Sequence, residues 1–274
     1  RVRMQMWEEK QKQDVVASTK KPVVAVVDIE TLPGEAFFFN PDGYITYDKV
    51  IQDISFLSWA GKIVGESTIY SDILTPNEAK SRNSQRITKS VYSFISKADI
   101  LIGHNIVDFD YKYLQTFFLL NNMNPIRHRL IDTLKIARST FRFTYNKLVF
   151  INAKLGIRDK ISNEGFAFWA RCKTGDKDAL TEMKEYNEGD ILATEELFWR
   201  IQPYAVNLPN FGIYEDNAEP ICQCGCNEFT LNGYWTTNAS RYEKLECSKC
   251  HRLSRGKKNL LGKDQKSKLL SNLQ

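Results

Sequence analysis

Hydrophobic and polar positions along the chain follow two patterns, an uninterrupted apolar run and a helical spacing. Residues 23–27 are apolar at every position, which is typical of a strand buried on both faces and predicts one at 23–29. Residues 84–98 instead carry apolar side chains at 87, 91, 94 and 95, the spacing of one helix face. The same criteria predict strands at 54–60, 62–70, 99–103 and 128–132, and helices at 108–121, 133–140, 147–155 and 177–200.

Turn and cap residues separate these elements. Gly61 is expected in the turn between the strands 54–60 and 62–70, and Gly156 is expected to end the helix 147–155. Asp176 is a suitable N-cap for the long helix that follows it, and Pro203 closes that helix. Strands interleaved with helices predict an α/β fold over residues 22–202.

The pattern changes after residue 202. Residues 203–220 contain three prolines and few periodic apolar positions, so we expect a linker there. Five of the six cysteines follow, all between positions 222 and 250. The predicted order is an N-terminal arm at 1–21, the α/β domain at 22–202, the linker at 203–220, a cysteine module at 221–256 and a basic tail with a short helix at 257–274.

Composition places the chain among ordinary globular proteins. Its 274 residues are 42% hydrophobic and 26% charged, and no apolar run is long enough to cross a bilayer. No signal peptide is visible, so we expect a cytoplasmic protein of a bacterium or a phage-infected cell and no membrane partner. The net charge is +5 with a pI near 8.7.

The positive charge is concentrated near the C-terminus. The segment from position 241 onward contains ten Lys or Arg residues (241, 244, 249, 252, 255, 257, 258, 263, 266, 268) and only three acidic residues (243, 246, 264). Such an arm favours a nucleic-acid partner, and the alternative is a solvated tail.

Acidic residues stand at the ends of several predicted elements. Asp28 and Glu30 lie two apart on a strand, so their side chains leave the same face. Tyr186 and Asp190 lie four apart on a helix and share a face, and Asp110 falls where a strand gives way to a helix. Carboxylate oxygens are the ligands that Mg²⁺ and Mn²⁺ prefer, so four gathered carboxylates can hold two divalent ions and cut phosphodiesters.

Three of these segments resemble a known family. They are Asp-Ile-Glu-Thr at 28–31, the run from Gly103 to Leu114, and Tyr-Asn-Glu-Gly-Asp at 186–190. They resemble the exonuclease motifs of the DEDD superfamily, in particular the proofreading domain of family B DNA polymerases and its stand-alone, phage-type relatives. The resemblance covers about residues 22–202 and implies a ribonuclease H-like fold, a mixed sheet flanked by helices. Tyr186 fits the tyrosine subtype, because the histidine subtype needs His where this chain has Glu185.

The resemblance also implies residue roles. Asp28, Glu30 and Asp190 would hold one Mg²⁺ or Mn²⁺ ion, Asp110 would support a second, and Tyr186 would orient the attacking water. The implied substrate contacts are Thr31, Leu32, Asn105 and Phe109, and the alternative role of Asn105 is to fix its loop. Asp108 and Asp132 are expected to be structural, and His104 to serve packing or hydrogen bonding rather than catalysis.

Two aromatic groups have alternative interpretations. Phe37, Phe38 and Phe39 are either a stacking platform for unpaired bases or, the favoured reading, part of a buried strand. Phe166, Phe168 and Trp169 either cap the site or pack in the core, and core packing is again favoured.

The cysteine module resembles a zinc ribbon. Cys222-Gln-Cys-Gly-Cys226 is followed, after a segment patterned as a β-hairpin, by Cys247-Ser-Lys-Cys250. Two cysteine knuckles joined in this way bind one structural Zn²⁺. Cys247 and Cys250 are the expected ligands of the second knuckle. Cys222 and Cys224 are favoured in the first, with Cys226 as the alternative and His251 as a competitor.

These observations predict a metal-dependent 3′→5′ exodeoxyribonuclease that releases nucleoside 5′-monophosphates from single-stranded DNA. The expected ribbon contacts to phosphates come from Lys249, Arg252, Arg255, Lys257 and Lys258. The alternatives are an exoribonuclease and a non-catalytic nucleic-acid-binding accessory protein of replication. A polymerase acting in trans is a further expected partner.

Overall fold

The computed structural model describes residues 22–40, 46–157, 165–210, 213 and 219–270. The chain divides into two compact units, one of residues 23–205 and one that contains residues 206–274. The expected N-terminal arm at 1–21 lies outside the described residues. Among the described helices, none combines the length and the apolar character that a membrane crossing requires.

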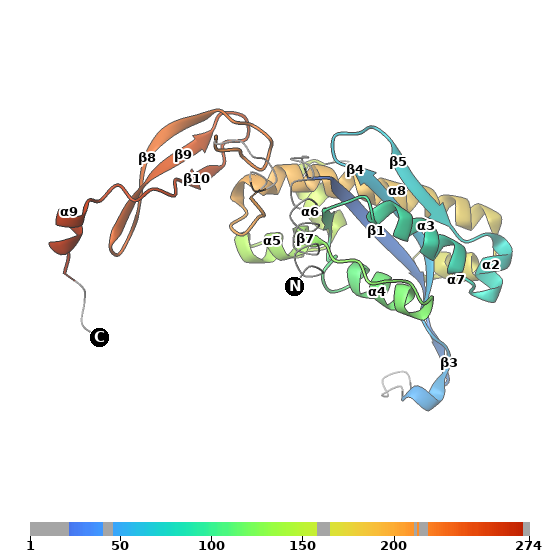
Figure 1. Ribbon diagram of the computed structural model, residues 1–274. Coiled ribbons are helices and arrows are strands. Elements are labelled where there is room, and N and C mark those ends of the chain that lie inside the picture. The colour runs from blue at the N-terminus through green and yellow to red at the C-terminus, as the bar shows by residue number, and fades with distance from the viewer. Residues whose placement is uncertain (1–21, 41–45, 158–164, 211–212, 214–218, 271–274) are drawn as a thin grey trace, which may run out of the picture. The chain divides into compact units, whose positions relative to one another are not determined.

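A five-stranded mixed sheet forms the centre of the first unit, in the order β5-β4-β1-β6-β7 (Figure 1). Strand β1 (Val24–Leu32) runs parallel to β6 (Ile100–Gly103), which runs parallel to β7 (Arg129–Asp132). On its other side β1 pairs antiparallel with β4 (Ser55–Ile63), and β4 pairs antiparallel with β5 (Ile69–Ile73). The central position of β1 explains why its sequence is apolar without alternation.

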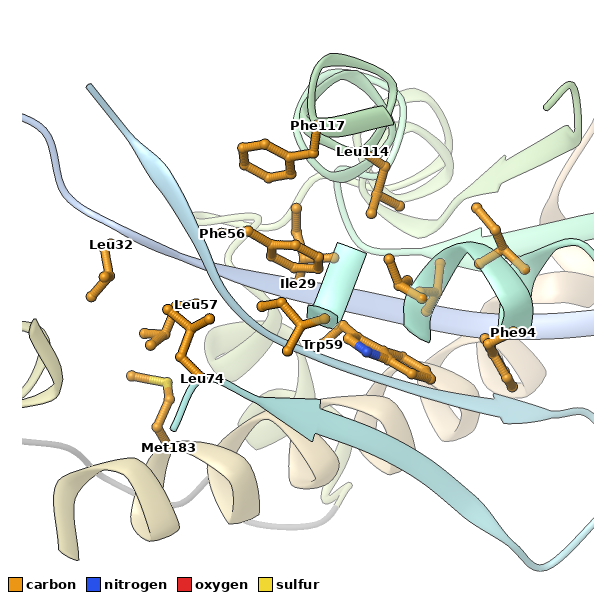
Figure 2. Packing of buried hydrophobic residues seen from close by; sticks show 14 of the residues in the cluster. Ile29, Leu32, Phe56, Leu57, Trp59, Leu74, Phe94, Leu114, Phe117 and Met183 are labelled. Atoms are coloured by element: carbon orange, nitrogen blue, oxygen red, sulfur yellow. The ribbon is translucent and has the colours of Figure 1, made fainter. Parts of the chain in front are cut away.

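Helices cover both faces of this sheet. Leu114 and Phe117 of α4 (Asp110–Leu120) lie on one side of the strands, and Met183 of α8 (Lys177–Ile201) lies on the other (Figure 2). Helix α3 (Gln85–Ile95) packs on β4, β5 and α4, whereas α8 packs across β1, β4 and β5. The remaining helices of the unit are α2 (Pro76–Ser81), α5 (Thr133–Thr140), α6 (Leu148–Leu155) and α7 (Phe166–Lys173), with 3₁₀ turns at Tyr47–Lys49 and Gln202–Tyr204.

Several predicted boundaries are confirmed. The side chain of Asp176 accepts hydrogen bonds from the backbone N–H groups of Asp178 and Ala179, which caps α8. Helix α6 ends at Gly156, whose φ of 63° places it in the left-handed region that favours glycine.

The prediction for Gly61 is wrong. This glycine lies within β4 rather than in a turn, and the chain turns instead near Gly65, where φ is 93°. The reason is a long-range contact, because a Cβ on Gly61 would lie 2.3 Å from the ring of Phe94 on α3. The absence of a side chain lets that ring close over the strand, and a local turn signal cannot report this.

The favoured reading of the phenylalanine triplet is also wrong. Phe37, Phe38 and Phe39 are exposed and follow β2 (Glu35–Ala36), which pairs with β3 (Val50–Gln52). These two short strands form a sheet separate from the main one.

The second unit contains a three-stranded antiparallel sheet in the order β10-β9-β8. Its strands are β8 (Phe229–Thr237), β9 (Ser240–Cys247) and β10 (Leu253–Arg255), and a short helix α9 (Lys263–Ser267) follows. The predicted hairpin is thus confirmed. It brings Cys247, at the end of β9, opposite Phe229 at the start of β8.

Candidate functional site

Three carboxylates meet where β1 passes under α8. One ligand oxygen each of Asp28, Glu30 and Asp190 lies within 4.8 Å of the others. Asp28 and Glu30 share a face of β1 because they are two residues apart, and α8 places Asp190 against that face. Three like charges this close repel one another unless a cation lies between them, and hard oxygen donors fit Mg²⁺ or Mn²⁺.

Asp110 lies beside this group without belonging to it. It is the first residue of α4, it is buried, and its Oδ1 accepts the backbone N–H of Ile29 at 3.0 Å. Ile29 separates Asp28 from Glu30, so this hydrogen bond ties α4 to the centre of the first motif. Burial raises the pKa of Asp110 to about 7, with a smaller contribution from the charge of Asp132.

A buried polar chain positions one of the carboxylates. Asn187 Nδ2 donates to Asp28 Oδ2 at 2.6 Å, and Asn187 Oδ1 accepts from Ser58 Oγ at 3.2 Å. Both Asn187 and Ser58 are 1% exposed. Ser58 lies directly opposite Glu30 in the β1–β4 ladder, so the chain links strand, helix and strand around the carboxylates.

Sequence reasoning quoted Asn187 within a motif but gave it no role, and it missed Ser58. Two signals were present. Asn187 stands three residues before Asp190 and so shares its helix face, and Ser58 is a polar residue inside the apolar run Phe56-Leu57-Ser58-Trp59-Ala60.

Tyr186 lies one helical turn before Asp190 and is buried. Its ring centroid is 6.5 Å from that of Phe168 and 6.3 Å from that of Trp169, both on α7 and both edge-on. The favoured reading of these two α7 residues as packing is confirmed, whereas Phe166 is exposed. The packing holds the ring of Tyr186 against α7.

Comparison with known proteins agrees with this architecture. The family model RNase_H_2, of the RNase_H superfamily, matches residues 59–202. The chain belongs to the RNase H superfamily. The predicted α/β, ribonuclease H-like fold, with a mixed sheet between helices, is thereby confirmed.

A family B DNA polymerase from the hyperthermophilic archaeon Pyrobaculum calidifontis has a similar structure, with a TM-score of 0.50 and 15% sequence identity. The match covers 71% of this chain and 27% of that polymerase, so the chain spans about a quarter of the larger protein. At this identity the similarity concerns the fold. No curated protein sequence matches the chain.

The residues expected to contact the substrate differ in their exposure. Thr31 is partly exposed directly after Glu30, and Phe109 is partly buried against Tyr113, with ring centroids 4.9 Å apart. The predicted substrate contact of the Leu32 side chain is wrong. This side chain is 0% exposed in the main core, so it is not available to a nucleotide. The β1 register shifts between Glu30 and Thr31, which sequence cannot reveal.

Asn105 borders an open groove of about 520 Å³. Its backbone adopts a φ of 74°, and its N–H donates to Asp132 Oδ1 at 3.1 Å. The groove is also lined by Arg138 and Lys147, which give it positive charge. Phosphate groups can bind such a surface.

Residues expected to be structural make structural contacts. Asp132 accepts backbone N–H groups of Asn105, Val107, Leu134 and Lys135, so it organises the second motif and caps α5. Asp108 is exposed and pairs with Lys112 and Lys135, which lower its pKa. His104 lies 2.9 Å from both Thr133 Oγ1 and the carbonyl of Asn146, so it connects the start of α5 to the loop before α6.

Four thiols form a second cluster, in the C-terminal unit. The Sγ atoms of Cys222, Cys224, Cys247 and Cys250 all lie within 4.8 Å of one another. The pairs Cys222–Cys250 and Cys224–Cys247 are 3.5 Å apart. A tetrahedral site with Zn–S bonds of about 2.3 Å requires sulfur separations of about 3.8 Å, so the cluster fits Zn²⁺.

The backbone of the second knuckle favours the thiolate of Cys247. Burial raises the pKa of Cys247, but the N–H groups of Cys250 and Lys249 and the thiols of Cys224 and Cys250 together outweigh burial and bring that pKa to about 6, whereas burial raises the pKa of Cys224 to about 11. Gly225, with a φ of 80°, closes the first knuckle by donating its N–H to the carbonyl of Cys222. Such N–H···S and turn geometry is what a bound metal requires.

Two competing ligands lie outside the cluster. Cys226 Sγ accepts the N–H of Glu228 at 3.4 Å, and His251 Nδ1 lies 3.0 Å from Glu246 Oε1. Arg252 must also be reassigned, because it is buried beside Cys222 and Cys250 rather than exposed to phosphates.

Proposed function

We propose that the protein is a metal-dependent 3′→5′ exodeoxyribonuclease of the tyrosine subtype, which removes nucleoside 5′-monophosphates from single-stranded DNA. The observation that carries the proposal is the convergence of Asp28, Glu30 and Asp190 within 4.8 Å, with Tyr186 one turn away on α8. The RNase H superfamily fold and the structural similarity to a family B DNA polymerase support a nuclease.

Each residue has a distinct role in this proposal. Asp28, Glu30 and Asp190 hold Mg²⁺ or Mn²⁺, and Asp110, beside Ile29, supports a second ion. When bound by these residues, the two ions would supply Lewis-acid activation of water and would neutralise charge on the phosphate. The Tyr186 hydroxyl orients the water for in-line attack, because the ring is held rigidly against α7.

The strand to be cut enters past Asn105, where Arg138 and Lys147 neutralise phosphates of the last nucleotides. Thr31, directly after the first motif, contacts the terminal nucleotide, and Phe109 packs near it. Only an unpaired 3′ end reaches a site of this kind, which underlies the proposed preference for single strands.

We further propose that the cysteine cluster binds one structural Zn²⁺ through Cys222, Cys224, Cys247 and Cys250, and that residues 221–256 are a zinc ribbon joined by a linker, 203–220, to the exonuclease domain at 22–202. A module this small cannot bury enough apolar surface to fold alone, so the metal supplies its stability. A polymerase in trans is a suitable partner for such an enzyme.

The test is digestion of 5′-labelled and 3′-labelled oligonucleotides, as DNA and as RNA, with Mg²⁺ or Mn²⁺. The control is a variant carrying Asp28→Ala and Glu30→Ala with unchanged zinc content. We expect a ladder of 5′-labelled DNA that shortens from its 3′ end and is lost in the variant. Faster loss of RNA would assign an exoribonuclease. Unaltered DNA and RNA with retained binding would leave a non-catalytic accessory protein.

A further inference from the structure

The ribbon exposes large side chains that a small β-sheet normally buries. Every residue of β8 after Phe229 is exposed, and Tyr234 and Trp235 are 57% and 53% exposed. Exposed aromatic rings on a small domain mark a binding surface more often than a core defect.

The strand register places rings and cations together on one face. Trp235 lies directly opposite Tyr242 in the β8–β9 pair, and Arg255 lies directly opposite Lys244 in the β9–β10 pair. Lys244 is two residues from Tyr242, so all four side chains leave the same face of the sheet. The guanidinium of Arg255 lies 4.4 Å from the centroid of the Tyr242 ring, which aligns the cation with the aromatic plane.

The opposite face has a different character. Tyr234 lies opposite Glu243, two residues from Arg241, whose guanidinium is 5.7 Å from the Tyr234 ring centroid. Its one cation is therefore offset by one carboxylate. On the face of Trp235, the two cations Lys244 and Arg255 are accompanied by one carboxylate, Glu246, which also accepts a hydrogen bond from Asn232, so one positive charge is left in surplus.

We propose that this face, defined by Trp235, Tyr242, Lys244 and Arg255, binds single-stranded nucleic acid by stacking an unpaired base on Trp235, beside the Tyr242 ring that Arg255 covers, and pairing phosphates with the two cations. The chemistry of the surface selects this partner, because a single strand presents exposed base faces and phosphates in alternation. A duplex hides its base faces, and an acidic peptide presents carboxylates but no base faces to stack on the rings. Lys257 and Lys258, exposed just after β10, extend the cationic path.

This inference rests on the proposed function, since the ribbon would hold the strand that the exonuclease domain shortens. It differs from a general basic grip, because affinity must depend on one face and on aromatic rings. Tyr234, equally exposed on the other face, is a matched control for Trp235.

The experiment measures binding of a 5′-fluorescein-labelled oligothymidylate by anisotropy. It uses the full chain, zinc-loaded, with Asp28→Ala and Glu30→Ala to prevent digestion. We expect Trp235→Ala to weaken binding about tenfold or more and Tyr234→Ala to change it less than about twofold. Arg255→Ala should weaken binding and reduce the slope of log affinity against log salt concentration by about one, which corresponds to one lost phosphate contact. Zinc content and circular dichroism verify that each variant is folded.

The proposal is overturned by parental affinity in a folded Trp235→Ala variant, by equal losses in Trp235→Ala and Tyr234→Ala, or by an equal loss of duplex binding. Digestion by the chain with intact carboxylates separates the two proposals. Absent digestion with a Trp235-dependent affinity refutes the exonuclease and keeps the binding face. Digestion together with an affinity that does not depend on Trp235 keeps the exonuclease and refutes the binding face.

Discussion

Replacing Asn187 by Leu tests how the metal centre is assembled. The substitution keeps the approximate volume of a side chain that is 1% exposed, but it removes the donor that lies 2.6 Å from Asp28 Oδ2. That oxygen belongs to a carboxylate that we propose as a metal ligand. Hydrogen bonds that orient metal ligands typically change metal affinity by about 10- to 100-fold.

The magnitude follows from the charge on the acceptor. A hydrogen bond to an ionised group contributes about 1.5–3 kcal/mol, and about 1.4 kcal/mol corresponds to a factor of ten in affinity. We therefore expect the Mg²⁺ concentration that gives half-maximal exonuclease rate to rise at least about tenfold. The substitution also leaves Ser58 Oγ without the acceptor now 3.2 Å away, so stability should fall by about 1 kcal/mol.

The assay is the initial rate of digestion of a single-stranded oligonucleotide against Mg²⁺ concentration, with urea unfolding measured on the same samples. Ser58→Ala is the matched control, because it removes only the outer hydrogen bond and should shift the metal dependence by less than about threefold. The reasoning is refuted if Asn187→Leu leaves the half-maximal Mg²⁺ concentration unchanged. It is also refuted if the rate at saturating Mg²⁺ is abolished in a folded protein.

Three further predictions concern other parts of the chain. Cys224→Ser should abolish binding of one Zn²⁺, whereas Cys226→Ser should keep it, as measured by metal content after gel filtration. Glu78→Gln should cost about 1 kcal/mol at pH 7, because the partly exposed ion pair with Arg86 is screened by solvent. Arg86 lowers the pKa of Glu78 from 4.5 to about 2, so this contribution is complete above pH 4.5 and disappears as pH falls toward 2, which unfolding at several pH values checks. Gly61→Ala should lower the free energy of unfolding by about 2 kcal/mol, since its Cβ would lie 2.3 Å from a core ring.

The sequence predicts most of the secondary structure because those signals are local. An apolar run without alternation indicates the central strand β1. Asp176 caps the start of α8 and Gly156 ends α6 through contacts within four residues. The convergence of Asp28, Glu30 and Asp190 was also predictable, because strand and helix periods fix which side chains share a face. Only the packing of α8 on β1 had to be supplied by the fold.

What the sequence missed depends on contacts between distant residues. Asn187 and Ser58 are 129 positions apart, so the local signals at each residue do not show that their side chains hydrogen-bond to one another. Gly61 was misplaced because its partner, Phe94, comes from a helix that follows the next strand. The choice between Cys224 and Cys226 likewise depends on the register of a hairpin that brings Cys247 back to the first knuckle.

The buried position of these polar groups couples the activity of the site to the stability of the fold. Helix α8 turns Asn187 and Asp190 toward the sheet on the same face that buries Met183 and Leu197. Unsatisfied polar groups in such an interface cost about 1–3 kcal/mol each, so the apolar contacts along α8 must hold the donors in register. A substitution that shifts α8 would separate the carboxylates and would also leave the buried polar groups without their hydrogen-bond partners, which lowers the stability. Loss of activity at this interface therefore identifies a positioning residue only when unfolding, measured on the same variant, shows that the helix is still in place.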